Sequence, residues 1–234
     1  MLPLRDDQPR FSTPWVNYFL IGLNLVIFFL EWSLDPRSLE LLARQFGVVP
    51  SHVGMFLSGS PKYPLVAIVL PFFTSLFLHG SWMHVIGNMW FLYIFGDNVE
   101  DYLGHFKYLV FYLLTGVLAM GTHLVMNMGS TAPALGASGA IFGVLGAYFV
   151  LYPRARVLTW IFEVLILVVW IPAWIILIYF FVLNFLSGTQ TLLAVHRQNM
   201  GGVAFWAHVG GFISGALLVK VFGERRMRYP YAVQ

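Results

Sequence analysis

The chain consists of long apolar stretches without charge, separated by short charged or turn-forming segments. The first stretch, Phe11 to Leu30, holds 20 residues, which is about the number that a helix needs to cross a bilayer. Trp15 and Trp32 lie near its ends, as expected for aromatic residues at a membrane surface. The pattern predicts a spanning helix over residues 14–32. A long outer loop, 33–80, follows, and its many apolar residues are expected to lie on or partly in the membrane.

The rest of the chain has room for five more spans. Residues 108–153 carry no charge, and the turn-like segment 129–133 divides them into two helices. Residues 157–186 carry only Glu163, and we expect Pro172 to kink a single helix there. We therefore predict an all-α polytopic membrane protein, with a single domain over residues 1–234 and six helices over residues 14–32, 81–97, 107–128, 136–152, 157–186 and 203–222.

Six spans place both termini on the same side of the membrane. Nine of the 13 Lys and Arg residues then fall on the side of the termini, and four fall on the other side. Because basic residues near spans favour the cytoplasmic side, we expect both termini to be cytoplasmic. Residues 1–10 lack the pattern of a cleavable signal peptide, so the first span is expected to remain in the protein.

Composition narrows the class of protein further. Apolar residues make up 59% of the chain and charged residues 10%, whereas a soluble domain has about 25% charged residues. A water-soluble globule is therefore excluded. The chain has no Cys, which excludes disulfides and thiolate metal sites, and a net charge of +3 indicates no binding of nucleic acid.

Polar side chains inside spans are costly, so several at one depth indicate a site. His84 and Asn88 are four residues apart, on one face of the second predicted helix and close to its outer end. Ser138 lies in the first turn of the fourth helix, and His208 lies about five residues into the sixth. All three helices run inward from the outer side. These four side chains are therefore expected to converge in the outer leaflet.

Small residues recur every four positions in the fourth and sixth helices, and such stripes allow helix backbones to approach closely. The stripes are Gly139, Gly143 and Ala147 in one helix and Ala207, Gly211 and Gly215 in the other. Their contact would bring Ser138 to His208. A serine hydroxyl within about 3 Å of an imidazole is the minimal activated nucleophile. Since no carboxylate lies at that depth, we expect a Ser–His dyad without an orienting acid.

Hydrolysis of a peptide also requires hydrogen-bond donors for the developing oxyanion. The side chains of Asn88 and His84 are suitable donors. The backbone N–H groups of Ser138 and Gly139 are also suitable, because first-turn N–H groups have no partner within their helix and lie at its positive end.

Three segments resemble the motifs of the rhomboid intramembrane serine proteases. Gly136-Ala137-Ser138-Gly139 resembles the GxSG nucleophile motif, and residues 207–211 resemble the segment with the catalytic histidine. His79, His84 and Asn88 resemble the second-span pattern, and residues 95–101 (FGDNVED) are also similar to the family. The resemblance covers residues 72–218. A Trp-Arg pair that many members carry in the first outer loop is absent here.

The resemblance implies an intramembrane endopeptidase. Ser138 would be the nucleophile, His208 the general base and then acid, and His84 and Asn88 the oxyanion donors. Phe142 would stack on the imidazole, at a position where many members have Tyr. The residues expected to support the site are His79, Gly136, Gly139, Phe142 and Gly211.

The resemblance also implies which partners the protein has. Substrates would be transmembrane proteins that enter laterally from the bilayer lipid, between the second and fifth spans. Pro172, Trp170 and Trp174 would make the fifth span a gate. No metal or cofactor is implied. In a prokaryotic cell the expected location is the plasma (inner) membrane.

Two alternatives stay open at this point. His84, His123 and His208 could ligate haem, as histidines do in membrane cytochromes. A rhomboid-like pseudoprotease would bind membrane helices without cleavage, although the presence of a nucleophile, a base and donors argues against it. His52, His105 and His196 are expected to be ordinary loop or interfacial residues, and Glu163 is expected to have a structural role. Glu31 and Glu100 lie at span ends, where we expect them to be solvated, and Glu100 is expected to tie the second span to a neighbour.

Overall fold

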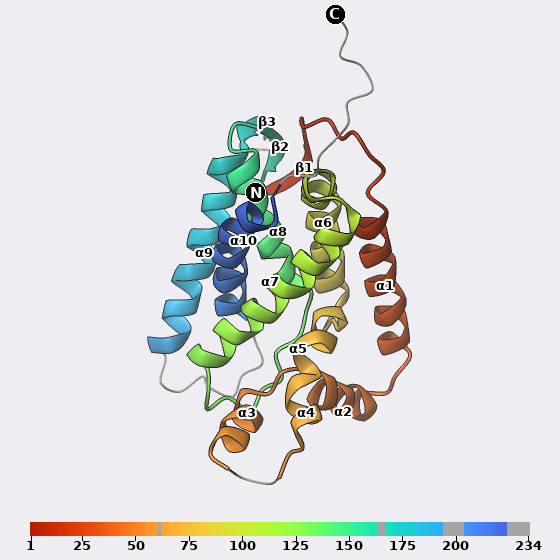
Figure 1. Ribbon diagram of the computed structural model, residues 1–234, viewed down its shortest axis with the longest axis vertical. Coiled ribbons are helices and arrows are strands. Elements are labelled where there is room, and N and C mark those ends of the chain that lie inside the picture. The colour runs from red at the N-terminus through yellow and green to blue at the C-terminus, as the bar shows by residue number, and fades with distance from the viewer. Residues whose placement is uncertain (60–61, 163–166, 194–203, 224–234) are drawn as a thin grey trace, which may run out of the picture.

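The computed structural model describes residues 1–59, 62–162, 167–193 and 204–223. Within these residues, six long helices run side by side and form the body of the molecule (Figure 1). They are α1 (Trp15–Trp32), α6 (Trp82–Leu103), α7 (His105–Met126), α8 (Ser138–Leu151), α9 (Ala173–Leu193) and α10 (Phe205–Phe222).

Short elements close the two ends of this bundle (Figure 1). The segment between α1 and α6 lies at one end and contains α2 (Pro36–Phe46), α3 (Pro50–Leu57), α4 (Leu65–Val69), α5 (Pro71–Thr74) and the 3-10 helix η1 (Ser75–Phe77). At the other end lies an antiparallel sheet in the order β1-β2-β3, formed by β1 (Leu2–Asp6), β2 (Arg156–Ile161) and β3 (Leu167–Pro172).

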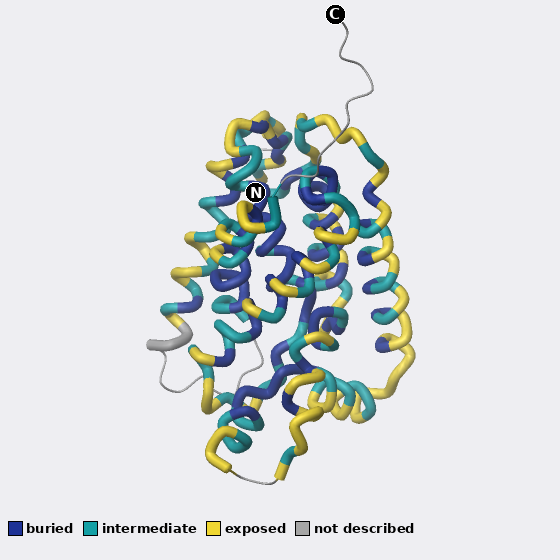
Figure 2. Tube along the Cα trace, viewed as in Figure 1, coloured by how far each residue is buried: buried dark blue, intermediate teal, exposed yellow. Residues whose placement is uncertain are grey.

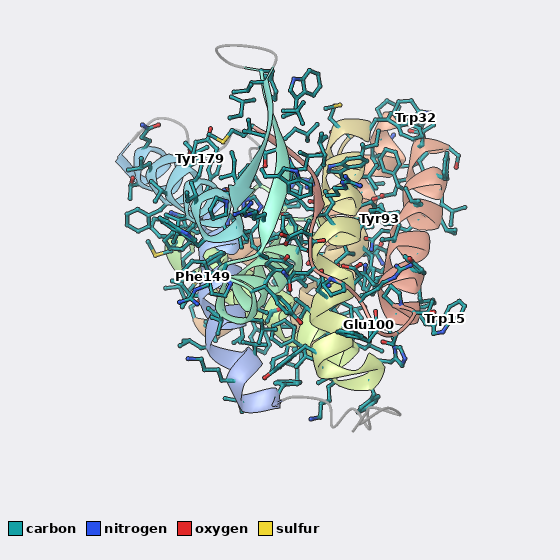
Figure 3. All side chains as sticks on the ribbon, turned by 90° about the horizontal axis from the view of Figure 1, so that it is seen from above. Trp15, Trp32, Tyr93, Glu100, Phe149 and Tyr179 are labelled. Atoms are coloured by element: carbon teal, nitrogen blue, oxygen red, sulfur yellow. The ribbon has the colours of Figure 1, made fainter. Side chains whose placement is uncertain are left out.

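The helices have the length and apolarity of membrane spans. In the described part of the chain, four helices meet this test alone: α1, α7, α10 and residues 173–190 of α9. Residues 65–77 and α6 meet it as a pair that is bent by 78°. The chain is therefore a polytopic helical membrane protein, as the hydropathy pattern predicts. Trp15 and Trp32, both exposed, mark the two ends of α1 (Figure 3).

The expectation of one helix over residues 157–186 is wrong. Residues 156–172 instead contain β2 and β3, paired from Arg156↔Pro172 to Ile161↔Leu167, and α9 begins only at Ala173. These strands are rich in β-branched and aromatic residues, which favour extended backbone, and their apolarity alone does not distinguish a strand from a helix. Trp170 consequently lies on a strand, and only Trp174 lies on the helix. Glu163 lies outside the described residues.

Helix α8 lies at the centre of the bundle, where most of its residues are buried (Figure 2). The two predicted stripes of small residues meet there. A Cβ added at Gly211 would collide with the backbone of Gly139, and one added at Gly215 would collide with the backbone of Gly143. The backbones of α8 and α10 are therefore in direct contact, which only glycine permits.

Helix α8 is also short. Its 14 residues span about 21 Å, less than the roughly 30 Å of a hydrocarbon core. The segment before α8 covers the remaining thickness as irregular backbone, and this backbone is hydrogen-bonded to other parts of the protein. Ala134 pairs with Val48, and the N–H of Gly136 donates to the carbonyl of Ser75 over 2.8 Å. Non-helical backbone at membrane depth requires such protein partners. Ser138, the first residue of α8, is thereby recessed into the bundle.

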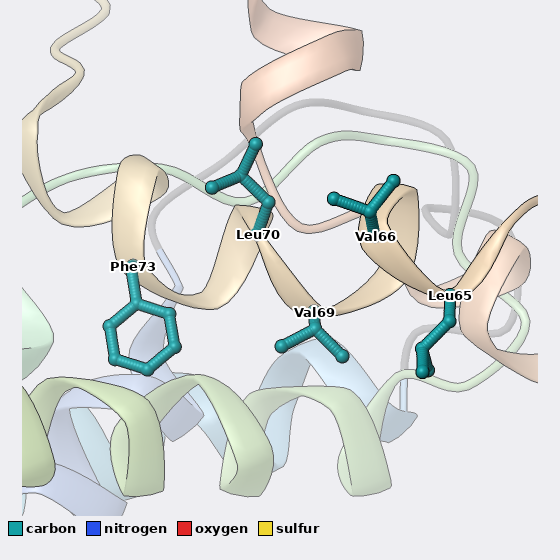
Figure 4. Close-up of a pocket in the computed structure, with 5 residues that line it drawn as sticks. All are labelled: Leu65, Val66, Val69, Leu70 and Phe73. Carbon is teal, nitrogen blue, oxygen red and sulfur yellow. The ribbon is translucent and has the colours of Figure 1, made fainter.

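The segment between α1 and α6 exposes apolar side chains along α4 and α5. Five of them line an open pocket: Leu65, Val66, Val69, Leu70 and Phe73 (Figure 4). All but Phe73 and Leu70 come from α4, and each of the five is substantially exposed. Exposed apolar side chains at this density are typical of surfaces that contact lipid or another protein, and the position of the outer loop on the membrane stays a prediction.

Candidate functional site

Ser138 and His208 form the centre of the candidate site. The Ser138 Oγ atom lies 2.7 Å from the His208 Nε2 atom, a hydrogen-bond distance. Ser138 begins α8 and is half-buried, whereas His208, in the first turn of α10, has an exposed fraction of only 7%. The backbone contact between α8 and α10 fixes this pairing, and the hydroxyl stays within reach of a reactant.

Two further contacts hold the imidazole of His208. Its Nδ1 atom lies 2.6 Å from the side-chain Oδ1 atom of Asn184, on α9. The ring of Phe142 stacks on it, with a centroid distance of 4.4 Å and an interplanar angle of 7°. Phe142 lies one turn after Ser138, in the position that the resemblance to rhomboid proteases implies. Asn184 was not among the residues expected from the sequence.

His84 lies beside Ser138 because of the backbone at Gly136. Gly136 has φ +126°, a conformation that a residue with a Cβ rarely adopts. A Cβ at this position would lie 2.7 Å and 2.8 Å from two atoms of the His84 ring and 3.6 Å from Ser138 Oγ. Because residue 136 has no side chain, the space between the imidazole of His84 and the hydroxyl of Ser138 stays open.

Asn88 and His79 extend the site behind His84. The Nδ2 atom of Asn88 lies 2.9 Å from His79 Nε2, and the rings of His79 and His84 meet edge to face with centroids 5.1 Å apart. His79 and Asn88 are both buried. The described contacts thus connect Asn88 to Ser138 through His79 and His84.

His79 is itself held from α1. The Glu31 carboxylate accepts a hydrogen bond from the backbone N–H of His79 over 3.1 Å. Glu31 has an exposed fraction of 4%, so the expectation that it is solvated at the end of its span is wrong. A buried carboxylate needs such donors. The sequence alone does not indicate this contact, because the two residues are 48 positions apart.

Glu100 is a second carboxylate that accepts hydrogen bonds from backbone N–H groups, at the other end of the bundle. Its carboxylate accepts from the backbone N–H groups of Val16 (3.0 Å) and Asn17 (2.7 Å), in the first turn of α1. A carboxylate at a helix N-terminus satisfies free donors and complements the helix dipole. The expectation that Glu100 ties the second span to a neighbour is therefore confirmed, and Figure 3 shows its place on α6.

The contacts of His208 speak against haem ligation. Both of its ring nitrogens have protein partners, Ser138 and Asn184, so that neither is free for an iron atom. His123, another residue considered for haem, lies at the end of α7, where its carbonyl accepts from the side chain of Asn127. His196 lies outside the described residues.

Comparison with known proteins identifies the family. The Rhomboid domain family model matches residues 68–225, which is more than half of the chain. This chain belongs to the rhomboid family. The match includes the helices that carry His84, Ser138, Asn184 and His208.

Relatives with rhomboid names are found in several eukaryotes. Rhomboid protein 1, mitochondrial, of Saccharomyces cerevisiae is 27% identical over 90% of this chain and 55% of its own length. Rhomboid-like protein 11, chloroplastic, of Arabidopsis thaliana is 34% identical over 65% of this chain and 52% of its own length. Presenilin-associated rhomboid-like protein, mitochondrial, of Homo sapiens is 27% identical over 62% of this chain and 36% of its own length.

This rhomboid chain spans about half the length of the first two of these relatives. Membership and the helices together establish an integral membrane protein of a family whose members are generally serine proteases and act on membrane proteins within the bilayer. Some rhomboid homologues are inactive, so family membership leaves the activity of this chain to be argued from its residues.

Proposed function

We propose that the chain is an intramembrane serine endopeptidase that hydrolyses peptide bonds in or near the transmembrane segments of other proteins. The observation that carries this proposal is the 2.7 Å distance between Ser138 Oγ and His208 Nε2. A buried base that is hydrogen-bonded to a partly exposed serine is the arrangement that nucleophilic catalysis requires. A pseudoprotease has no need of this pair.

In the proposed first step, Ser138 attacks the carbonyl carbon of the scissile peptide bond. The Oγ–C bond forms, the hydroxyl proton moves to His208 Nε2, and the carbonyl oxygen becomes an oxyanion. Collapse of this intermediate breaks the C–N bond, and His208 delivers its proton to the leaving amine. The products of this step are a free amine and a Ser138 acyl ester.

The second step repeats the first with water as the nucleophile. Water gives a proton to His208 Nε2 and its oxygen bonds to the acyl carbon, after which the C–Oγ bond breaks and the proton returns to Ser138. Because Ser138 is partly exposed rather than fully buried, water has access to the ester.

The oxyanion would be stabilised where His84 faces Ser138 across Gly136. The backbone N–H groups at Ser138 and Gly139 add donors and the positive end of the α8 dipole. Asn88 contributes from behind His84, through His79. Each donor of this kind supplies about 2.7 to 4 kcal/mol of transition-state stabilisation.

Substrates of the proposed protease are transmembrane helices that move laterally from the lipid between α6 and α9. The aromatic rings of Phe91 on α6 and Phe180 on α9 meet edge to face there, with centroids 5.1 Å apart. Two rings on separate helices form a contact that can open without breaking hydrogen bonds. With the termini cytoplasmic, as we propose, the site lies toward the outer side. In a prokaryotic cell this membrane would be the plasma membrane.

The test of this proposal is reaction with a fluorophosphonate probe, which phosphonylates activated serines. The purified protein in detergent should be labelled at Ser138, and Ser138→Ala should abolish labelling. His208→Ala should lower the labelling rate by about 10²- to 10⁴-fold, because the base is lost. Peptide mapping of the labelled protein identifies the serine.

The matched control is Ser214→Ala, which removes a half-buried hydroxyl of α10 that donates to its own helix, at Gly211. This variant should be labelled like the wild type. A folded wild-type protein that is neither labelled nor able to cleave transmembrane substrates in liposomes would refute the proposal and favour the pseudoprotease.

A further inference from the structure

Asn184 makes two hydrogen bonds that fix the orientation of its amide. Its Nδ2 atom donates to the backbone carbonyl of Phe180 over 2.8 Å, one turn earlier in α9. The Oδ1 atom is left to face His208 Nδ1 at 2.6 Å, where it can only accept. The Phe180 carbonyl therefore determines which end of the amide meets the histidine.

This orientation determines the tautomer of His208. An acceptor at Nδ1 requires the proton of a neutral imidazole to be on Nδ1, which leaves the lone pair on Nε2. The lone pair then faces the hydroxyl of Ser138 at 2.7 Å. With the proton on Nε2 instead, the ring could not accept the proton of the serine.

The packing of α9 against α10 holds Asn184 in this place. On one side, the rings of Phe185 and Trp206 meet at a centroid distance of 5.8 Å, and the indole N–H of Trp206 donates to the Gly188 carbonyl. On the other side, Phe181 contacts Phe212 with centroids 5.0 Å apart. The contact between Asn184 and His208 thus lies between two aromatic contacts that join the same two helices.

We infer that Asn184 is a positioning residue that fixes the tautomer and ring plane of His208, so that the chain uses a Ser138–His208–Asn184 triad. Its members come from α8, α10 and α9. The inference rests on the proposed function. It replaces the expected dyad with a triad whose orienting group is a neutral amide. An amide accepts the Nδ1–H bond without the large desolvation cost of a buried carboxylate.

The experiment compares Asn184→Ala, Asn184→Asp and wild type by probe labelling and by cleavage of a transmembrane substrate in liposomes, each across pH. Asn184→Ala should lower the labelling rate and kcat about 3- to 10-fold, as expected for one lost hydrogen bond, and leave KM unchanged. A defect confined to packing would instead reduce the amount of folded protein without changing the rate per folded molecule.

Asn184→Asp tests a quantity, the pH dependence of the rate, that would not change if Asn184 had only a structural role. The carboxylate still accepts from His208 Nδ1, but its negative charge favours the protonated imidazole. The acidic limb of the pH–rate profile should therefore move to higher pH. Among the described residues, the titratable side chains on neighbouring helices whose charge would influence the protonation of His208 are His84 on α6 and His123 on α7. Both are present in all variants.

Asn24→Ala is the matched control. Asn24 on α1 also donates its Nδ2 to the carbonyl four residues earlier, Leu20, but it lies in another helix and away from His208. This variant should keep the wild-type rate and pH profile. If wild type and Asn24→Ala are labelled while the Asn184 variants retain both the rate and the acidic limb, the inference fails and the proposed function stands. If folded wild type is neither labelled nor able to cleave the transmembrane substrate, the proposed function fails, and the inference fails with it.

Discussion

The imidazole of His208 is held on three sides before any substrate is present. Ser138 and Asn184 occupy its two nitrogens, and Phe142 covers one face. Catalytic groups that are fixed in their reactive geometry do not have to be ordered during the reaction, which lowers the activation barrier.

Gly136 provides the sharpest test at the scale of a single residue. Gly136→Ala places a methyl group within 2.8 Å of the His84 ring and forces a residue with a side chain into φ +126°. The strain costs about 1 to 3 kcal/mol, and displacement of His84 removes an oxyanion donor. We expect kcat in liposome cleavage to fall by about 10²-fold or more.

The control for this prediction is Gly22→Ala on α1, where an added Cβ has no atom within 4 Å. It should keep full activity and unchanged stability. Wild-type kcat in Gly136→Ala would show that the space between His84 and Ser138 has no catalytic importance.

The sequence identifies only part of this site. Ser138, His208, His84 and Asn88 stand in motifs, and their helices can be placed at one depth from the direction of each span. Asn184 has no motif around it. Its meeting with His208 depends on the rotation of α9 about its axis, which hydropathy does not determine when the start of that helix is misplaced by 16 residues, from 157 to 173.

At the scale of the elements, the contact between α8 and α10 joins Ser138, the proposed nucleophile, to His208, its proposed base. Gly215 lies against the backbone of Gly143, two turns away from the reactive pair. Gly215→Ala should push the helices apart, because backbone cannot move aside as a side chain can. We expect a loss of about 1 to 3 kcal/mol of stability, measured by thermal unfolding in detergent, together with slower probe labelling.

The outward side of α10 provides the comparison. Leu217 has an exposed fraction of 67%, so that Leu217→Phe should leave both the unfolding temperature and the labelling rate unchanged. Equal effects of the two substitutions would show that the close approach of the helices is unimportant.

The elements also show where hydropathy misleads. The pattern locates five of the six long helices to within a few residues, apart from an extra turn or more at the end of α6, which continues to Leu103. It misses the sheet, because residues 157–162 and 167–172 are uncharged and continue without a break in apolarity into the helix that follows them. Pairing of β1 with β2 joins residues more than 150 positions apart, and no local pattern indicates such a contact.

At the scale of the whole molecule, the N-terminal segment joins several elements. Strand β1 pairs with β2, the carbonyl of Pro3 accepts from the indole of Trp90 on α6, and Asp6 accepts from the hydroxyl of Tyr148 on α8. Since β3 leads directly into α9, residues 1–6 are connected through one sheet to the helix that carries Asn184.

Burial of Asp6 makes this connection sensitive to pH. Desolvation raises the pKa of Asp6 from 3.8 to about 6, against the opposing bond from Tyr148, and Asp7 raises it further. Because the folded protein holds the proton more tightly than the unfolded chain, this carboxyl favours folding fully below pH 3.8. Its contribution is lost as the pH rises through about 6.

The variant Asp6→Asn has no carboxyl at this position, so it should not lose stability as the pH rises through about 6. The difference in unfolding temperature between the variant and wild type should grow from pH 4 to pH 6 and then stay level. Solvent still reaches the carboxylate, so we expect about 1 kcal/mol, or about 2 to 4 °C, at pH 8. Glu40→Gln, at an exposed residue of α2, is the control. A difference that is constant over this pH range would contradict the assignment.

The shortness of α8 has a consequence for what such a protease selects. A helix that stops about 10 Å short of the full hydrocarbon thickness presents its first residue at a fixed level below the membrane surface. A peptide bond is attacked only if its own helix brings it to that level and unwinds there. Selection among substrates would then depend on the depth at which each transmembrane helix places its peptide bonds along the membrane normal, and on how readily that helix unwinds.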